Sequence, residues 1–165
     1  VRAGKPTLVG AATGLVAGLV VITPAAGFVE PWAAVVMGFV VSPVCYFAVS
    51  FLKRKLGYDD ALDAFGIHAV GGVTGGVLAG LFCVPELSWT DFGGLVYTGD
   101  PTLLGAQVLG ILVTVVFVGV LDVVLGFAVK ACFKGSLRVS EAEEAQGLDV
   151  AAHGESAYPA YVGLD

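Results

Sequence analysis

Four long apolar stretches limit what this chain can fold into more than any other feature of its sequence. They occupy residues 7–23, 31–52, 62–83 and 102–131, and each is near or above the roughly 20 residues that a helix needs to cross a bilayer. The 165-residue chain is 57% hydrophobic and 13% charged, whereas soluble domains carry about 25% charged residues. We therefore expect an all-α, polytopic membrane protein with four transmembrane helices within residues 1–131.

The basic residues lie on one side of these four expected spans. They are Arg2, Lys5, Lys53, Arg54, Lys55, Lys130, Lys134 and Arg138. The connections 24–30 and 84–101 carry only acidic charges, and the second also holds a Trp, a Phe and a Tyr, which suits an aromatic interfacial layer. Because cytoplasmic loops are enriched in Lys and Arg, both chain ends are expected in the cytoplasm. The polar, acidic segment 132–165 is then a cytoplasmic tail.

Glycines recur every four residues in the first and third stretches. The rows are Gly10, Gly14 and Gly18 in the first stretch, and Gly72, Gly76 and Gly80 beside Gly71 and Gly75 in the third. Residues four apart share one face of a helix, and small residues there let membrane helices approach closely. We expect both helices to be buried in a bundle, and the second and fourth, which are richer in bulky aliphatic residues, to face lipid.

The start of the chain fits two interpretations. Arg2 and Lys5 before an apolar run that ends near Ala25 and Ala26 resemble a secretory signal peptide with its cleavage region. The regular glycine spacing favours the other interpretation, a transmembrane helix in a piece of a longer protein.

The segment DDALDAFGIHAVGG (59–72) opens the third stretch with three carboxylates and a histidine. Carboxylates at a helix N-terminus accept hydrogen bonds from free N–H groups and complement the helix dipole. Asp59 and Asp60 are therefore expected to cap the helix. Asp63, expected in the first turn, either caps it as well or shapes the end of a pore.

His68 shares a helix face with Gly72 and Gly76, and this face is expected to be buried against other helices. An ionisable side chain within a membrane marks a conduction path or relay by default, and a neutral imidazole both donates and accepts hydrogen bonds. The alternative is a buried histidine bonded to a backbone carbonyl. The three cysteines share no ligand-like spacing, and no histidine cluster accompanies them, so no metal or other cofactor is expected.

At this point the sequence resembles a known family. DDALDAFGIHAVGG followed by VTGGVLAGLF is similar to the tenth transmembrane helix of ammonium transporters (Amt/Mep/Rh), with its D-x-F-G-x-H-G-x-x-G pattern. GKPTLVGAATGLVAGLVVITPAAGFV resembles the eighth helix, and LRVSEAEEAQGLDVAAHGESAY resembles the cytoplasmic C-terminal region of Amt-type members. The resemblance implies the last four of eleven helices plus the tail. It also implies a homotrimer in the plasma or bacterial inner membrane.

The resemblance further implies roles for individual residues. His68 matches the second of two pore histidines that touch through a hydrogen bond, although Ala69 replaces the glycine that usually follows. Thr23 matches a threonine near the external end of the pathway, and its alternative role is a hydroxyl bonded to its own helix backbone. Asp63 matches an aspartate one turn before the histidine. Independently of the resemblance, the sequence places Ala64 and Ile67 as hydrophobic neighbours of His68 in the expected pore.

In the tail, the resemblance assigns regulatory elements to the G-L-D and H-G-E-x-A-Y motifs. Their residues are Gly147, Leu148, Asp149, His153, Gly154 and Tyr158. The stretch EAEEAQ is expected to form one or two helical turns, and the rest of the tail to be loop-like. The implied docking surface is formed by cytoplasmic loops of the trimer, where a PII-type regulatory protein can also block the pore exit. The alternative is a solvated, disordered tail.

The function implied is ammonium transport, in which ammonium loses its proton and crosses a dry pore as ammonia while the histidine pair relays the proton. Two alternatives remain open: an ammonium sensor that signals to a cytoplasmic partner, and a non-conducting fragment with only an assembly role. No nucleophile accompanies His68, so an enzyme is not expected, and no nucleic-acid partner is indicated. Asp122, in the fourth stretch, costs roughly 2.5–3.5 kcal/mol on insertion scales and has no explanation in the sequence.

Overall fold

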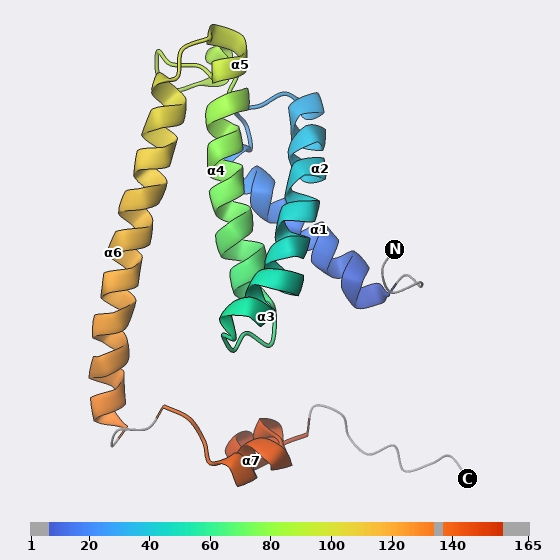
Figure 1. The fold of residues 1–165 in the computed structure, drawn as a ribbon, viewed down its shortest axis with the longest axis vertical. Coiled ribbons are helices and arrows are strands. Elements are labelled where there is room, and N and C mark those ends of the chain that lie inside the picture. Colours follow the sequence, from blue (N-terminus) through green and yellow to red (C-terminus); the bar gives the residue numbers. More distant parts are fainter. Residues whose placement is uncertain (1–6, 134–136, 157–165) are drawn as a thin grey trace. The chain divides into compact units, whose positions relative to one another are not determined.

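The structure is a computed structural model that describes residues 7–133 and 137–156 of the chain (Figure 1). These residues form helices joined by turns and loops, without a strand. Four helical segments are long and apolar enough to cross a membrane, which confirms the predicted all-α architecture with four spans. The chain divides into two units, residues 1–115 and 116–165.

The first span is α1 (Leu8–Ile22), which is followed by the 3-10 turn η1 (Thr23–Ala25). The hydroxyl oxygen of Thr7 accepts a hydrogen bond from the N–H of Gly10 at 3.0 Å, as an N-cap residue does. Gly27, with φ of 87°, then turns the chain toward the second span, since glycine adopts a left-handed backbone at little cost.

The second span passes through three consecutive helical segments: α2 (Pro31–Phe47), the π-helical η2 (Ala48–Leu52) and α3 (Lys53–Leu56). Proline suits the first position of α2 because the N–H there has no partner within the helix. Gly57, with φ of 66°, ends α3 in the left-handed conformation common after a helix C-terminus. The helical segment thus extends four residues beyond the end expected from hydropathy.

The third span consists of the π-helical η3 (Phe65–Ala69) and α4 (Val70–Phe82). The helical segment begins three residues later than expected, because Asp63 has a left-handed backbone with φ of 56° and lies before it. π-Helical turns are rare and occur frequently at functional sites. The turn η3 contains His68.

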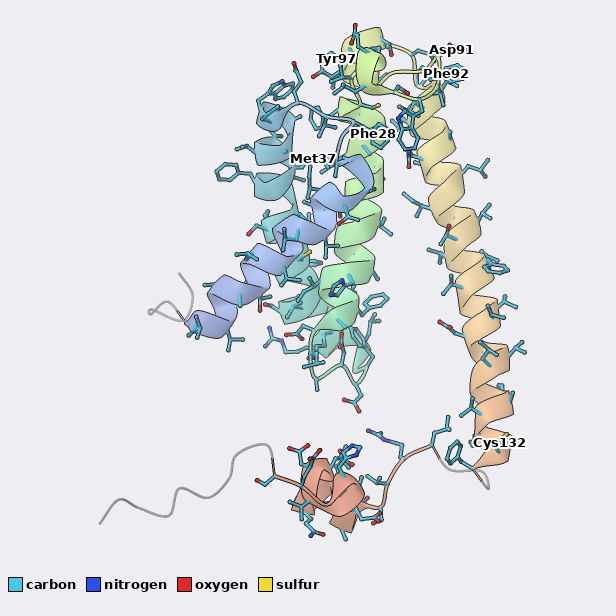
Figure 2. All side chains as sticks on the ribbon, turned by 180° about the vertical axis from the view of Figure 1, so that it is seen from behind. Phe28, Met37, Asp91, Phe92, Tyr97 and Cys132 are labelled. Atoms are coloured by element: carbon cyan, nitrogen blue, oxygen red, sulfur yellow. The ribbon has the colours of Figure 1, made fainter. Side chains whose placement is uncertain are left out.

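The helices α1, α2 and α4 pack around the hydrophobic core of the first unit. Met37 of α2 is fully buried (Figure 2) and shares this core with Val21 of α1 and Ala79 of α4. The buried residues of α2 recur every four positions, on one face of the helix: Ala33, Met37, Val41 and Cys45. The expectation that the second span faces lipid is therefore wrong for this face, which forms part of the core.

Two short helices, η4 (Pro85–Leu87) and α5 (Leu95–Thr98), lie between the third and fourth spans. The fourth span is α6 (Thr102–Cys132), a single helix of 31 residues without a buried residue in this chain. Its apolar surface is exposed in this chain, and the lipid-facing position expected for this span stays a prediction. In its first half, Leu104 and Ile111 nevertheless lie close to α4.

The described part of the tail contains α7 (Glu141–Gln146), as the sequence predicted, and the π-helical turn η5 (Asp149–His153). Ser140 and Glu143 form a capping box at the start of α7, and the hydrogen bonds from Ser140 lower the pKa of the Glu143 carboxyl. The expectation that the tail beyond EAEEAQ is loop-like is wrong for η5. Tyr158 lies outside the described residues.

Candidate functional site

His68 lies on the exposed side of a helical turn whose other side is packed. Gly66 and Ile67, in the same π-helical turn, are buried, whereas His68 and Ala64 are exposed. A Cβ atom added to Gly66 would lie 2.7 Å from Val49 Cγ2 and 3.3 Å from the Val49 backbone nitrogen. The two π-helical turns η2 and η3 are therefore in contact, and this contact fixes the turn that carries the imidazole.

The described residues of this chain leave His68 exposed, so its burial against other helices stays a prediction. Its neighbour on the same helix face, Gly72, has no atom within 4 Å of an added Cβ, whereas Gly76 packs against Ile111. Beyond His68, this face of α4 leads into a groove of ≈ 340 Å³ between α4 and α6. Its lining residues are Pro24, Gly72, Val73, Gly76, Gln107, Gly110, Ile111, Thr114 and Val115.

Two aspartates fix the start of the His68 helix. The carboxylate of Asp60 accepts hydrogen bonds from the backbone N–H groups of Ala64 and Phe65, both at 2.9 Å, which confirms its predicted role as a cap. Asp63 is outside the helix rather than in its first turn. Its Oδ1 atom accepts a hydrogen bond from Lys53 Nζ at 2.6 Å.

Thr23 lies at the end of α1, where its side chain is exposed. Its hydroxyl donates to the backbone oxygen of Leu19 at 2.7 Å, as the backbone-bonding alternative predicted. The next residue, Pro24, lies close to Gly75 of α4. Like Gly72, it lines the groove between α4 and α6. Gly75 is seven residues beyond His68, a helix rise of about 10 Å.

Sequence reasoning missed one polar cluster, which includes the carboxylate of Glu30. Its Oε2 atom accepts hydrogen bonds from Trp32 Nε1 at 2.6 Å and from the Tyr97 hydroxyl at 2.9 Å. Both hydrogen bonds lower the pKa of the Glu30 carboxyl, and the bond from Trp32 has the larger effect. The aromatic residues were recognisable as an interfacial layer, but their acceptor lies 67 positions from Tyr97, and no local pattern indicates that pairing.

Aromatic pairs surround this cluster. The rings of Trp32 and Phe82 meet edge to face at 5.7 Å, and those of Phe28 and Trp89 at 5.1 Å. Figure 2 shows Tyr97 and Phe92 near the same end of the first unit. Such edge-to-face pairs add about 0.5–1.5 kcal/mol each beyond the burial of area. The cluster therefore ties the loop before α2 to α5 and to the end of α4.

The expected regulatory residues of the tail lie around η5. Gly147 and Gly154 both have positive φ angles, 96° and 68°, in regions where a side chain is strained. Leu148, Asp149 and His153 are exposed. In the part of the chain that the structure describes, no three His, Cys, Asp or Glu residues form a possible metal site. Nothing in the described residues explains Asp122, which is exposed on α6.

Known proteins are similar to this chain over nearly its whole length. The model of the Ammonium Transporter Family matches residues 1–158. An ammonium transporter of Bacillus subtilis (strain 168) is 47% identical over 154 residues, which are 93% of this chain and 37% of that protein. A putative ammonium transporter of Methanothermobacter thermautotrophicus is 48% identical over 157 residues, which are 95% of this chain and 38% of that protein.

Solved structures of fungal relatives share the fold. Saccharomyces cerevisiae Mep2 matches with a TM-score of 0.75 and 38% identity, over 86% of this chain and 32% of that one. A mutant of Candida albicans Mep2 matches with a TM-score of 0.77 and 30% identity, over 98% of this chain and 38% of that one. The chain thus spans less than two fifths of the length of these relatives. By the family match and these identities, it belongs to the ammonium transporter family, a family of membrane transporters and not of enzymes.

Proposed function

We propose that this chain is the C-terminal part of an Amt-type ammonium transporter, with the last four of eleven helices, and that it lines one side of the conduction pathway. His68 is one member of the pore histidine pair, and its partner belongs to a part of the transporter outside this sequence. The transported species is ammonia, which crosses after ammonium has released its proton, and the imidazole pair relays that proton.

The exposure of His68 is the observation that carries this proposal. The histidine belongs to a span that is apolar enough to cross a membrane, yet its side chain is exposed in this chain. An ionisable side chain in lipid is costly, and such residues almost always face the interior of a bundle or a water-filled cavity. The relatives are more than twice as long as this chain, so the remaining helices have the length needed to cover this face.

The neighbouring residues fit the same pathway. Ala64 is exposed one turn before His68, and its small apolar side chain suits a dry pore wall. Thr23, at the end of α1, is assigned to the external end of the pathway. Asp63 lies at the cytoplasmic start of the His68 helix, where it pairs with Lys53. Its role is to shape this end of the pore.

The test is to replace His68 by alanine in the full-length transporter and to measure ammonium and methylammonium flux in proteoliposomes. Flux falls or its proton coupling changes, while the amount of assembled protein stays the same. Thr74→Ala is a matched control on the same helix, because the Thr74 hydroxyl donates to the backbone oxygen of Val70 at 2.7 Å. Unchanged flux and proton coupling in the His68 variant would show that His68 only packs against its neighbours and does not take part in transport.

We further propose that the tail is cytoplasmic and sets the state of the pore in a homotrimer. Two features support this. The basic residues before the tail favour the cytoplasmic side, and Leu148, just before η5, and Val150, within η5, are exposed at the surface. These apolar side chains suit docking on cytoplasmic loops. A PII-type regulatory protein would act on the same face.

The tail proposal is tested with two substitutions and one deletion in the full-length protein. Gly147→Ala strains a backbone with φ of 96°, and Asp149→Ala alters η5. Each lowers the transport rate without lowering membrane abundance, and so does deletion of everything after Val139. Wild-type rates in all three variants would contradict a regulatory tail.

A further inference from the structure

A lysine at the end of the second span holds the start of the helix that carries His68. Lys53 Nζ donates to Asp63 Oδ1 at 2.6 Å and to the backbone oxygen of Asp60 at 2.5 Å. The Lys53 and Asp63 side chains are 29% and 31% exposed, so the pair is partly shielded from water. A shielded ion pair with a second hydrogen bond fixes geometry better than a fully exposed pair does.

Both acceptors of Lys53 belong to residues that begin the helix. Asp60 caps it through two backbone N–H groups, and the backbone oxygen of Asp63 accepts from the N–H of Ile67 at 3.0 Å. Lys53 therefore contacts the two residues that determine where the helical hydrogen bonds start. A change in that starting point would rotate and shift His68, which is five residues after Asp63.

The backbone at Asp63 needs such support. It is the one non-glycine residue with a positive φ in the described ranges, at 56°. A left-handed backbone at a residue other than glycine costs of order 1–3 kcal/mol and persists only where the surroundings hold it. The bond from Lys53 and a bond from the Asp63 N–H to the Asp60 backbone oxygen at 3.2 Å supply that hold.

A second contact joins the same two segments one turn away. Gly66 of η3 lies against Val49 of η2, and Val49 is four residues before Lys53. The second span thus contacts the start of the third span at two places, through a close apolar contact and through an ion pair. Together they fix both the position and the rotation of the turn that carries His68.

We propose that Lys53 is a positioning residue for His68: through Asp63 and Asp60 it sets the register of the π-helical turn and hence where the imidazole lies in the pathway. This inference rests on the proposed function of His68. Relay of a proton between two imidazoles depends on their separation, and in enzymes a misplacement of 1 Å can cost about 100-fold in rate. Lys53 itself touches neither the proton nor the transported ammonia.

The experiment uses the full-length transporter in proteoliposomes, with methylammonium flux and the ratio of ammonium to methylammonium transport as readouts. Lys53→Met removes the charge, Lys53→Arg keeps it, and Asp63→Asn removes its partner while keeping a residue that tolerates a left-handed backbone. Lys55→Met is the matched control, because Lys55 is exposed and its Nζ atom lies over the Phe51 ring at 5.9 Å.

We expect Lys53→Met and Asp63→Asn each to lower flux by about fivefold or more and to change the ratio of ammonium to methylammonium transport. The double variant should lose no more flux than either single variant, because the two residues act as one unit. Lys53→Arg restores most of the flux, and Lys55→Met stays near wild type. If Lys53→Met does not assemble, Asp63→Asn carries the same test.

Combination with His68→Asn separates positioning from general stability. If Lys53 acts through His68, then Lys53→Met adds little to the loss already caused by His68→Asn. Full additivity of the two losses, or wild-type flux and substrate ratio in both Lys53→Met and Asp63→Asn, overturns the inference. Absence of ammonium flux in the wild-type protein, or unchanged flux and proton coupling in His68→Asn, instead overturns the proposed function.

Discussion

The glycine row of α1 and the two glycine rows of α4 have the same spacing but lie in different surroundings. In α1, an added Cβ at Gly14 or Gly18 would meet no atom within 4 Å. In α4, a Cβ at Gly75 would lie 2.4 Å from the backbone oxygen of Val21, and one at Gly80 would lie 2.8 Å from Leu104 Cα. Gly75 and Gly80 are thus required for close helix approach within this chain, whereas Gly14 and Gly18 are not.

The comparison shows that spacing identifies a smooth helix face but not the helix that covers it. α4 uses two adjacent rows for two neighbours: Gly71 and Gly75 face α1, whereas Gly76 and Gly80 face α6. α1 makes its own contact with the core through Ala17 and Val21, not through its glycines. The α1 row is an uncovered surface in these 165 residues.

The largest effect is expected at Gly75. In Gly75→Ala the new methyl group meets backbone oxygen at 2.4 Å and Pro24 Cγ at 2.9 Å, so α1 and η1 must move away from α4. Overpacking typically costs about 1–3 kcal/mol, and we expect the upper end because backbone atoms cannot rotate away. The measurement is the midpoint of thermal unfolding of the full-length protein in detergent.

Gly38→Ala is the control for this substitution. A Cβ at Gly38 in α2 meets nothing within 4 Å, so this variant should unfold at or above the wild-type temperature. Equal midpoints for Gly75→Ala and wild type would show that α1 does not approach α4 as closely as described.

A smaller effect is expected at Gly80, on the other row of α4. The new methyl group in Gly80→Ala would meet Leu104 Cα at 2.8 Å and Leu104 Cδ1 at 3.0 Å. The start of α6 must shift, and we expect a loss of about 1–2 kcal/mol. The loss is smaller than at Gly75 because α6 buries no residue in this chain. A loss larger than that of Gly75→Ala would reverse the ranking of the two contacts.

Gly76 tests whether a flexible side chain can move to make room for an added methyl group, which backbone atoms cannot do. Its Cβ would meet Ile111 Cδ1 at 2.9 Å, the flexible end of a side chain, so Gly76→Ala should cost about 1 kcal/mol or less. Ile111→Val removes that Cδ1 atom and should recover the stability lost in Gly76→Ala. Gly76→Leu should still disrupt assembly. If Ile111→Val gives no recovery, the contact with α6 is not made by this side chain.

Periodicity was enough to predict the four spans, the helix at EAEEAQ and the small-residue contacts of α4. It could not predict that α2 forms part of the core, because bulky aliphatic residues suit both lipid and a packed interior. It placed Asp63 in the helix, whereas the structure gives this residue a left-handed backbone before the helix begins. The side chain of Asp63 is held by Lys53, ten positions earlier, and periodicity does not indicate that contact. It placed His68 in a buried face because a glycine row marks a contact face without stating which segment of the protein supplies the contact.

The smallest effect is expected at Gly18, in the uncovered α1 row. Gly18→Ala adds a methyl group where the described chain offers open space, and alanine favours a helix over glycine by about 0.8–1.0 kcal/mol. The full-length protein should therefore keep its unfolding midpoint or gain slightly, and Gly14→Ala should behave alike. A loss as large as that of Gly75→Ala in either variant would mean that a helix outside these residues packs closely on the row. The glycine rows of α1 and α4 would then differ only in which part of the transporter covers them.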